Sequence, residues 1–346
     1  MSFIPLRKIL IIRLSSIGDI ILTSPMLRVL KAAHPDCELH YVTRVEFGEL
    51  LQHDPHIDRL MLVDTAEGAV GLEALNLQLM QEHYDAVFDL HNNFRSRSLR
   101  NGLSRYVHRI NKRGLRRLLL ISAHINTYGE TIPVPDRFIE TARRYGVQPD
   151  ALGPRIFLSE DIRMSARMKL RAEGIDPGIP VLGLCPGAKH FTKRWPLEHF
   201  LELARQLAAN GERLVLFGGT EDSDTAAGIR QIAPDHVHDM TGRLTLLETA
   251  AAMEYCRAII ANDSGLMHMA TAMQRPVVAL FGSTVKEFGF FPYHSPAVIL
   301  EVSDLPCRPC THIGRSRCPK GHFACLQQIT PEQVIEALST LLPSPD

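Results

Sequence analysis

The feature that most constrains the fold is a short apolar run followed by a polar turn and a helical pattern. Residues 258–261 have the character of a buried strand, residues 262–265 are polar, and Leu266, Met269 and Met273 recur on one helical face. The first amides of a helix have no partners within the helix and attract anions, so this turn predicts a phosphate or pyrophosphate site. An ordinary Asp/Ser N-cap is the alternative interpretation.

The amino-terminal stretch repeats this arrangement. Residues 8–12 predict a parallel strand, residues 13–19 a polar glycine turn, and residues 20–30 a helix that Pro25 should kink or restart. Asp19 is expected near the helix start, at the sheet edge where open α/β sheets bind substrates, and its carboxylate could accept a proton there. Helix capping by Asp19 is the alternative. The residues expected to present amides and hydroxyls to a ligand are Ser15, Ser16 and Gly18.

Length and alternation of elements predict two α/β domains. The chain has 346 residues, and strand and helix patterns alternate on both sides of a turn-rich segment at 147–154. We therefore expect doubly wound, mainly parallel domains at 1–155 and 156–346. The 38 basic residues balance the 38 acidic ones, and neither a long apolar run nor a signal peptide is seen, which favours an intracellular protein.

One tract departs from the balanced charge. Residues 95–117 contain nine Lys or Arg residues and no acid. A solvated helix face is one interpretation, and an anionic partner such as lipid headgroups or phosphorylated glycans is the other. Aromatic residues do not interleave with these cations, which argues against nucleic acid.

Three further strand-to-helix turns in the second half carry polar or glycine residues. The turn at 186–196 combines a glycine with cations that could neutralise a leaving diphosphate, the turn at 217–221 places an acid where ribose hydroxyls could bind, and the turn at 281–284 completes the same edge. The candidate ligand-binding residues in these turns are Gly187, Lys189, Thr192, Lys193, Gly219, Glu221 and Thr284.

Five motifs in this order resemble glycosyltransferase family 9, the family of ADP-heptose:lipopolysaccharide heptosyltransferases. They are the stretches 15–19, 186–196, 217–221, 262–268 and 280–284, and the resemblance spans nearly the whole chain. The resemblance implies a GT-B fold, with two Rossmann-like domains facing a central cleft. It also implies that a carboxyl-terminal helix at 331–342 packs back toward the first domain.

The resemblance further implies inverting transfer of a heptose from an ADP-linked donor to the lipopolysaccharide inner core, without a divalent metal. Asp19 would act as general base, and Lys193 with the amides of Ser264, Gly265 and Leu266 would hold the diphosphate beside Asp263. His268 would orient the site or be a packed core histidine. Ala188-Lys189 stands where many relatives have a hydroxyl-bearing residue. The donor contacts in that turn are therefore an open question.

The basic tract would then grip the phosphates and acidic Kdo sugars of the acceptor. The acceptor-binding candidates are Arg95, Arg97, Arg113 and Arg116. Because the acceptor is embedded in a membrane, the resemblance implies a cytoplasmic protein that is peripheral at the inner membrane.

Four cysteines near the carboxyl terminus form a separate motif. Cys307, Cys310, Cys318 and Cys325, with His322 nearby, have a spacing that suits tetrahedral zinc or iron as a structural site. Reduced thiols and a disulfide are the alternatives. Protein-modifying heptosyltransferases of the family are associated with an iron-bound cysteine finger.

Other functions fit the same sequence. A family 9 transferase could use another nucleotide sugar or an autotransporter protein as acceptor. A nucleotide-sugar epimerase shares the two-domain architecture, and a glycan- or nucleotide-binding protein could keep the fold without the chemistry. The presence of Asp19 and Lys193 argues against the non-catalytic alternative.

Overall fold

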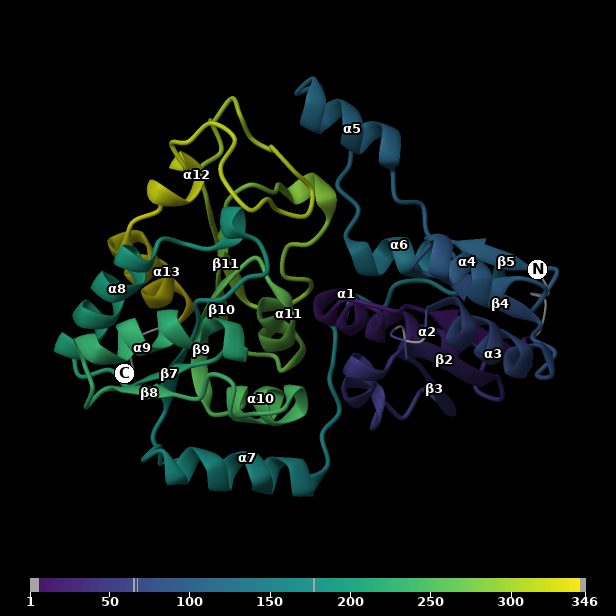
Figure 1. Ribbon diagram of the computed structural model, residues 1–346, viewed down its shortest axis with the longest axis horizontal. Helices are drawn as coiled ribbons and strands as arrows, with labels where there is room; N and C mark the ends of the chain where they lie inside the picture. The colour runs from purple at the N-terminus through teal and green to yellow at the C-terminus, as the bar shows by residue number, and fades with distance from the viewer. Residues whose placement is uncertain (1–5, 65, 67, 177, 343–346) are drawn as a thin grey trace. The chain divides into compact units, whose positions relative to one another are not determined.

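The computed structural model describes residues 6–342 except 65, 67 and 177 (Figure 1). Contacts divide the chain into two compact units: unit 1 comprises residues 1–112 and 132–157, and unit 2 comprises residues 113–131 and 158–346. The main division lies close to the expected boundary. Residues 113–131 differ from expectation, because they group with unit 2.

Unit 1 contains a five-stranded parallel sheet in the order β3-β2-β1-β4-β5. Its strands are β1 (Lys8–Ile12), β2 (Glu38–Arg44), β3 (Arg59–Val63), β4 (Ala86–Asp89) and β5 (Val107–Arg109). Its α-helices are α1 (Ile17–Ile21), α2 (Ser24–Ala33), α3 (Gly68–Met80), α4 (Phe94–Arg100) and α6 (Val134–Glu140), and its 3₁₀ helices are η1 (Val45–Leu51) and η3 (Arg143–Tyr145). The strand order reverses between β1 and β4.

Local sequence explains most of these elements. The apolar run of β1 is almost entirely buried, as expected of a central strand covered on both faces. Pro25 lies in the first turn of α2, so the predicted helical stretch restarts there, as the sequence indicated. The short strand β5 inside the basic tract was not predicted, because three residues give no periodic signal.

Unit 2 contains a six-stranded parallel sheet in the order β11-β10-β9-β6-β7-β8. The strands are β6 (Val181–Cys185), β7 (Leu214–Leu216), β8 (Val237–Asp239), β9 (Cys256–Asn262), β10 (Val277–Phe281) and β11 (Ala297–Glu301). The α-helices are α5 (Gly114–Ser122), α7 (Glu160–Ala172), α8 (Leu197–Ala209), α9 (Ser223–Ile232), α10 (Leu246–Met253), α11 (Gly265–Ala272), α12 (Ala324–Gln327) and α13 (Pro331–Leu341). The 3₁₀ helices are η4 (Phe191–Lys193), η5 (Thr220–Asp222) and η6 (Lys286–Phe288). Here the order reverses between β6 and β9.

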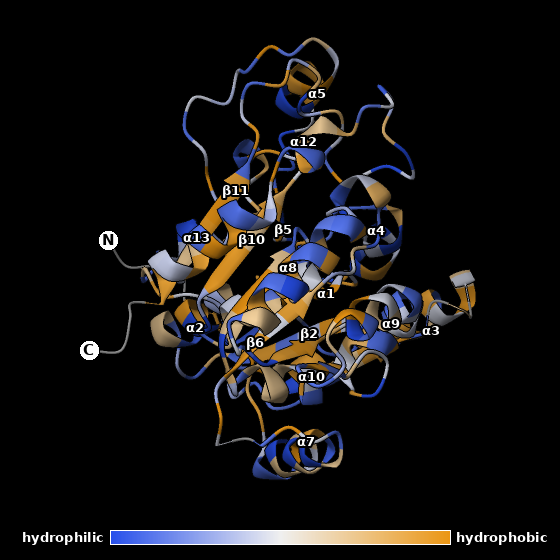
Figure 2. Cartoon of the chain, turned by 90° about the vertical axis from the view of Figure 1, so that its left-hand side faces the viewer, coloured by the Kyte–Doolittle hydropathy of each residue, from blue (hydrophilic) through white to orange (hydrophobic). Residues whose placement is uncertain are grey.

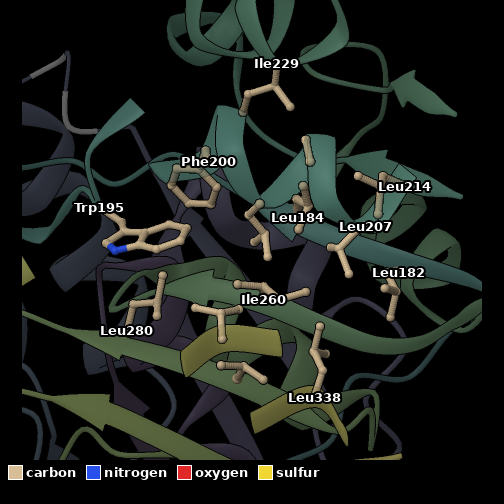
Figure 3. Close-up of a cluster of buried hydrophobic side chains, with 14 of the residues drawn as sticks. Leu182, Leu184, Trp195, Phe200, Leu207, Leu214, Ile229, Ile260, Leu280 and Leu338 are labelled. Carbon is tan, nitrogen blue, oxygen red and sulfur yellow. The ribbon is translucent and has the colours of Figure 1, made fainter. Parts of the chain in front are cut away.

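The core of unit 2 lies between its sheet and helices α8, α9 and α13 (Figure 3). Trp195 is buried in it against Phe200, with ring centroids 4.8 Å apart, and its indole N–H donates to the carbonyl of Ile329. Helix α13 contributes Val334 and Leu338 to the same core. These apolar residues therefore pack within unit 2, and the packing of this helix toward the first domain stays a prediction.

Hydropathy follows this layering, since the strands are mostly apolar and the helices mixed (Figure 2). Within the described residues, we find no helix whose length and apolar character would let it span a bilayer.

Candidate active site

Asp19 lies at the carboxyl end of β1, beside the reversal of strand order in unit 1. Its carboxylate forms a salt bridge with Arg13, with 2.7 Å between Arg13 Nη2 and Asp19 Oδ2. The hydroxyl of Ser16 donates to the same oxygen at 3.1 Å, and the Ser16 amide approaches it at 3.4 Å. Asp19 therefore caps its own helix while its side chain stays 19% exposed, and the transfer of a proton to its carboxylate stays a prediction.

Arg13 is a site residue that the sequence analysis missed. It directly follows the apolar strand, and its guanidinium is almost buried. Its Nε donates to the Ser15 carbonyl at 2.8 Å and its Nη1 to the Leu90 carbonyl at 2.5 Å. Arg13 therefore joins the loops that follow β1 and β4 and fixes the orientation of Asp19. A charged residue immediately after a buried strand was the available signal.

The loop after β4 is ordered by Asp89, which is fully buried. Its carboxylate accepts hydrogen bonds from the amides of His91 and Asn92 and pairs with Arg100 at 2.9 Å. Asn93 caps α4 by accepting from the Ser96 amide. Arg100 of the basic tract therefore has a structural partner, and the remaining α4 cations, Arg95 and Arg97, are exposed.

His91 stands in this loop, near Arg13. Burial and the positive charge of Arg13 lower the pKa of His91 to about 3, so the ring is neutral at physiological pH. Its Nδ1 is buried without a hydrogen-bond partner among the described residues. The sequence analysis missed this histidine as well, because nothing in its spacing separates it from an ordinary loop residue.

The residues of the β1 loop that were predicted to face a ligand also make contacts within the loop. Ser16 directs both its amide and its hydroxyl to Asp19, and Gly18 is buried inside α1. Ser15 uses its carbonyl to hold Arg13. A carboxylate thus already occupies the start of this helix, which leaves the loop better suited to proton transfer than to anion binding.

A second candidate cluster lies in unit 2, where the loops after β6 and β9 flank the reversal of strand order. Lys193 Nζ lies 2.7 Å from Asp263 Oδ2, and the hydroxyl of Thr284 donates to the same oxygen at 2.6 Å. Asp263 is almost fully buried, and the Lys193 side chain is 16% exposed. The structure therefore brings together three residues predicted from three separate motifs.

Asn262 connects the loops around this cluster. Its side-chain amide donates to the Pro186 carbonyl at 2.7 Å, and its side-chain oxygen accepts from the Trp195 amide at 3.0 Å. Because Asn262 is fully buried at the end of β9, these bonds hold both ends of the 186–195 loop against the sheet.

Helix α11 starts at Gly265 beside Asp263, and its N-cap residue is Ser264. Ser264 makes no side-chain cap hydrogen bond, which is also true of the N-cap residues of α2, α8 and α9, whereas α4, α7, α10 and α13 are capped in this way. The Ser264 hydroxyl is buried without a partner in the described structure. Amides and a hydroxyl at this helix start can therefore serve a bound anion.

The glycine turns after β6 and β7 are held together by Asp222, which the sequence analysis did not single out. A Cβ built on Gly187 would lie 2.1 Å from Asp222 Oδ2, so only glycine permits this approach. The same carboxylate accepts from the Gly219 amide at 3.2 Å, and burial raises its pKa. Neighbouring Glu221 is exposed, which is compatible with its predicted contact to a ribose.

Three other predicted donor residues have different surroundings. Lys189 is exposed. Thr192 is 1% exposed, and its hydroxyl accepts from the Arg315 amide at 2.8 Å, which gives it a packing role. His268 is buried on α11 with its ring 6.2 Å from that of Phe290, a geometry that favours the packed-histidine interpretation.

The four predicted acceptor arginines are distributed over both units. Arg95 and Arg97 belong to α4 of unit 1, whereas Arg113 and Arg116 belong to the α5 segment of unit 2. The sequence tract is continuous, but the fold divides it after residue 112.

The predicted metal site at the four cysteines does not have a matching geometry. All four thiols are free, and they line one small pocket together with His322, Lys320 and Arg308. Within residues 6–342, apart from the three that are not described, no group of three or more His, Cys, Asp or Glu side chains could hold a metal ion. Burial raises the pKa of Cys325 to about 11 and also raises that of Cys310, so both favour the protonated thiol.

Arg308 ties this cysteine segment to the loop after β10. Its guanidinium donates to the carbonyls of Gly282 and Thr284 at 2.6 and 2.7 Å and pairs with Glu301. These bonds therefore hold the cysteine segment against the loop that contains Thr284. An Arg between two cysteines gave no sequence signal for this role.

Comparison with known proteins identifies the family. The family model for glycosyltransferase family 9 (heptosyltransferase) matches residues 72–320. The chain belongs to this family. It is therefore a glycosyltransferase, and the five motifs identified it correctly.

Individual relatives agree with this assignment. Lipopolysaccharide heptosyltransferase 2 of Salmonella typhimurium is 29% identical, with 97% of this chain and 98% of that protein covered. A family 9 glycosyltransferase structure from Veillonella parvula gives a TM-score of 0.82 at 26% identity, with 97% of both chains covered. The structure of E. coli ADP-heptose lps heptosyltransferase II gives 0.75 at 27% identity, covering 96% of this chain and 98% of that one. The fold of this family 9 member is GT-B, as predicted.

Proposed function

We propose that this chain is an inverting transferase that moves a heptose from ADP-L-glycero-D-manno-heptose to the Kdo/heptose inner core of lipopolysaccharide. The observation that carries the proposal is the uncapped start of α11 beside the cluster of Lys193, Asp263 and Thr284. Relatives named lipopolysaccharide heptosyltransferase 2 match over almost the full chain, which supports the sugar and the acceptor.

Unit 2 would bind the diphosphate of the donor. The amides at the start of α11 and the ammonium of Lys193 provide positive charge, and Asp263 fixes the position of that ammonium. As the bond between the anomeric carbon and the phosphate oxygen breaks, negative charge accumulates on the ADP leaving group. These groups would stabilise that charge with the residues of this chain alone, and the proposal needs no metal ion.

Unit 1 would supply the base. The acceptor hydroxyl oxygen forms the new bond to the anomeric carbon on the face opposite the departing phosphate, and its proton passes to the Asp19 carboxylate. Arg13 holds that carboxylate in place through the 2.7 Å salt bridge. Attack on the opposite face inverts the anomeric configuration.

The exposed Arg95 and Arg97 of α4 are the acceptor contacts that fit best, because guanidinium groups bind phosphates and sugar carboxylates in a bidentate manner. The acceptor is an amphiphile anchored in a membrane. We therefore also propose that the protein works on the cytoplasmic face of the inner membrane as a peripheral protein.

The proposal is tested by incubating the protein with ADP-heptose and a panel of truncated core acceptors while ADP release is followed. The acceptor type used by heptosyltransferase 2 relatives is the first to include. ADP release that depends on one core acceptor, with heptose recovered in the product, supports the proposal.

The alternatives give other results in the same experiment. A protein-modifying enzyme would label an autotransporter fragment instead, and an epimerase would isomerise the nucleotide sugar without any acceptor. A non-catalytic binding protein would bind ADP-heptose without turnover. Any of these three outcomes would overturn the proposal.

A further inference from the structure

Helix α5 presents an apolar face that has no described partner. Leu115 and Leu118 are 72% and 59% exposed and lie on the same side of the helix. Ile125, which is 54% exposed, is held beside the helix end because its amide donates to the Leu119 carbonyl at 3.3 Å. Single exposed leucines are common, but here three large apolar side chains are exposed on one short segment.

The side of α5 opposite Leu115 and Leu118 packs against other residues of unit 2. Leu120 packs with Tyr128 and Phe288, and Asn126 donates to the Glu287 carboxylate at 3.0 Å. Figure 1 shows α5 at the end of two extended connections, and this small cluster anchors one side of the helix. The exposed leucines therefore follow from the way α5 is anchored.

Positive charge surrounds the apolar face. Lys112, Arg113, Arg116 and Arg117 lie within or just before α5, and the sequence has no acid between Asp89 and Glu130. Arg116 is exposed one residue from Leu115, and its guanidinium donates to the Tyr128 carbonyl at 3.3 Å. Long cationic side chains beside an apolar helical face are typical of helices that lie in a membrane interface.

We propose that the α5 segment, residues 112–125, docks on the surface of a bilayer that contains anionic phospholipid. Leu115, Leu118 and Ile125 enter the boundary of the acyl chains, and the neighbouring cations contact the headgroup phosphates. The inference deepens the proposed function, since the acceptor of that reaction is embedded in such a surface, and docking there places the protein beside it.

A bilayer fits these features better than a protein or glycan does. A soluble glycan would not bury exposed leucines. The charge of the segment is entirely positive, which suits a surface of uniform negative charge. The apolar face is too short to provide the area that a stable protein–protein interface buries. The vesicle-binding and fluorescence experiments give a different result for each of these partners.

The test measures how the full chain binds vesicles of phosphatidylcholine alone and vesicles with about one-third phosphatidylglycerol, because anionic headgroups attract basic segments. We expect binding to the anionic vesicles that weakens as salt rises. The double substitution Leu115→Ser with Leu118→Ser should weaken it about tenfold, since two apolar side chains are lost from the interface.

A matched control removes the same kind of side chain elsewhere. Met164→Ser with Met168→Ser changes two methionines of α7 that are 62% and 61% exposed, and it should leave vesicle binding unchanged. Equal binding of the α5 double variant and the unmodified protein would overturn the inference. Equal losses in both double variants would do the same, because general apolar exposure would then explain the binding.

A spectroscopic measurement follows insertion directly. The only tryptophan, Trp195, is buried, so a second one introduced by Leu118→Trp reports on α5. Its emission should shift to the blue with anionic vesicles, whereas Met164→Trp should not shift. A shift produced by a soluble core glycan or by rising protein concentration alone would identify the acceptor or a second copy as the partner instead.

Turnover separates this inference from the proposed function. The α5 double serine variant should keep the normal rate on a water-soluble truncated acceptor and lose most of its rate on acceptor embedded in anionic vesicles. Equal rates on embedded acceptor would contradict docking. Vesicle binding with no turnover on either acceptor would leave docking intact and refute the proposed function alone.

Discussion

Both units contain a strand followed by a polar turn and a helix, but the side chains at the two helix starts differ in their charge contacts. In unit 1 the start of α1 is occupied by Asp19, whose carboxylate accepts from Ser16 and pairs with Arg13. In unit 2 the start of α11 has no side-chain cap, and Lys193 lies close by, held by Asp263. The acid at the start of α1 thus caps its own helix, whereas the acid beside α11 is engaged by Lys193 and Thr284 and the helix has no side-chain cap.

This difference separates two roles that the sequence pattern alone assigns to both turns. A helix start whose amides are already satisfied by its own acid is a poor anion site, whereas an uncapped start with a neighbouring ammonium is a good one. This difference supports the proposal that unit 1 supplies the base and unit 2 binds the diphosphate. The predictions below test that division.

The largest effect is expected from Asp19→Asn. The amide keeps the shape of the side chain but cannot take the acceptor proton, so the transfer rate should fall by about a thousandfold. Steady-state ADP release with the core acceptor measures this. Asp150→Asn removes another paired acid of unit 1 and should keep the wild-type rate. A near-normal rate in the Asp19 variant would exclude Asp19 as the base.

Next in size is the effect of Lys193→Gln. Loss of the ammonium removes charge stabilisation at the leaving group, and the rate should fall about a hundredfold while the KM for the donor rises. Lys189→Gln removes the same charge from an exposed position of the same loop and should have a much smaller effect. Equal effects of the two substitutions would show that only the general charge of the loop matters.

A smaller effect concerns acid stability in unit 1. The pKa of His91 is about 3 in the folded protein and about 6.5 in an unfolded chain. Folding is therefore least opposed by this residue above about pH 6.5, where the ring is neutral in both states. That contribution is lost as the pH falls from about 6.5 toward 3, and it amounts to about 2 kcal/mol or less between pH 7 and 5.

Denaturant unfolding of the wild type and of His91→Gln at pH 7 and pH 5 measures this contribution. The variant should lose less stability than the wild type over that interval. His190→Gln provides a control in unit 2, because burial and the neighbouring cations lower the pKa of His190 while the residue stays partly exposed. An identical pH dependence of the His91 variant and the wild type would contradict the assignment.

The smallest effect is expected within the basic tract. Arg97→Gln on α4 should raise the acceptor KM about threefold, with a dependence on salt that fits an exposed cation. Arg100→Gln should instead lower the free energy of unfolding, by about 3 kcal/mol, because it leaves the buried Asp89 carboxylate without its partner. The reverse pattern would mean that Arg100 and Arg97 have exchanged roles.

Much of the fold follows from local sequence. The parallel strands are continuous apolar runs, the restart of the helix at Pro25 is a local steric effect, and the alternation of elements gives two doubly wound sheets. The pairing of residues 113–131 with unit 2 could not be predicted, because it depends on long-range packing of Leu120 against Phe288.

The site divides in the same way. Asp19, Lys193, Asp263 and Thr284 stand in recognisable turns, so the sequence alone singled them out as candidates. Arg13, Asp222 and Arg308 contact loops that are distant in the sequence, and no local pattern encodes such contacts. The cysteine spacing suggested a metal, but spacing along a loop does not fix the directions of the side chains.

Calorimetric titration of ADP into the wild type, Asp19→Asn and Lys193→Gln tests the division between the two edges most directly. We predict that the Asp19 variant binds ADP with the wild-type Kd, whereas the Lys193 variant binds it about tenfold more weakly, as expected for the loss of a charged contact. Weakened binding in the Asp19 variant together with unchanged binding in the Lys193 variant would contradict the account.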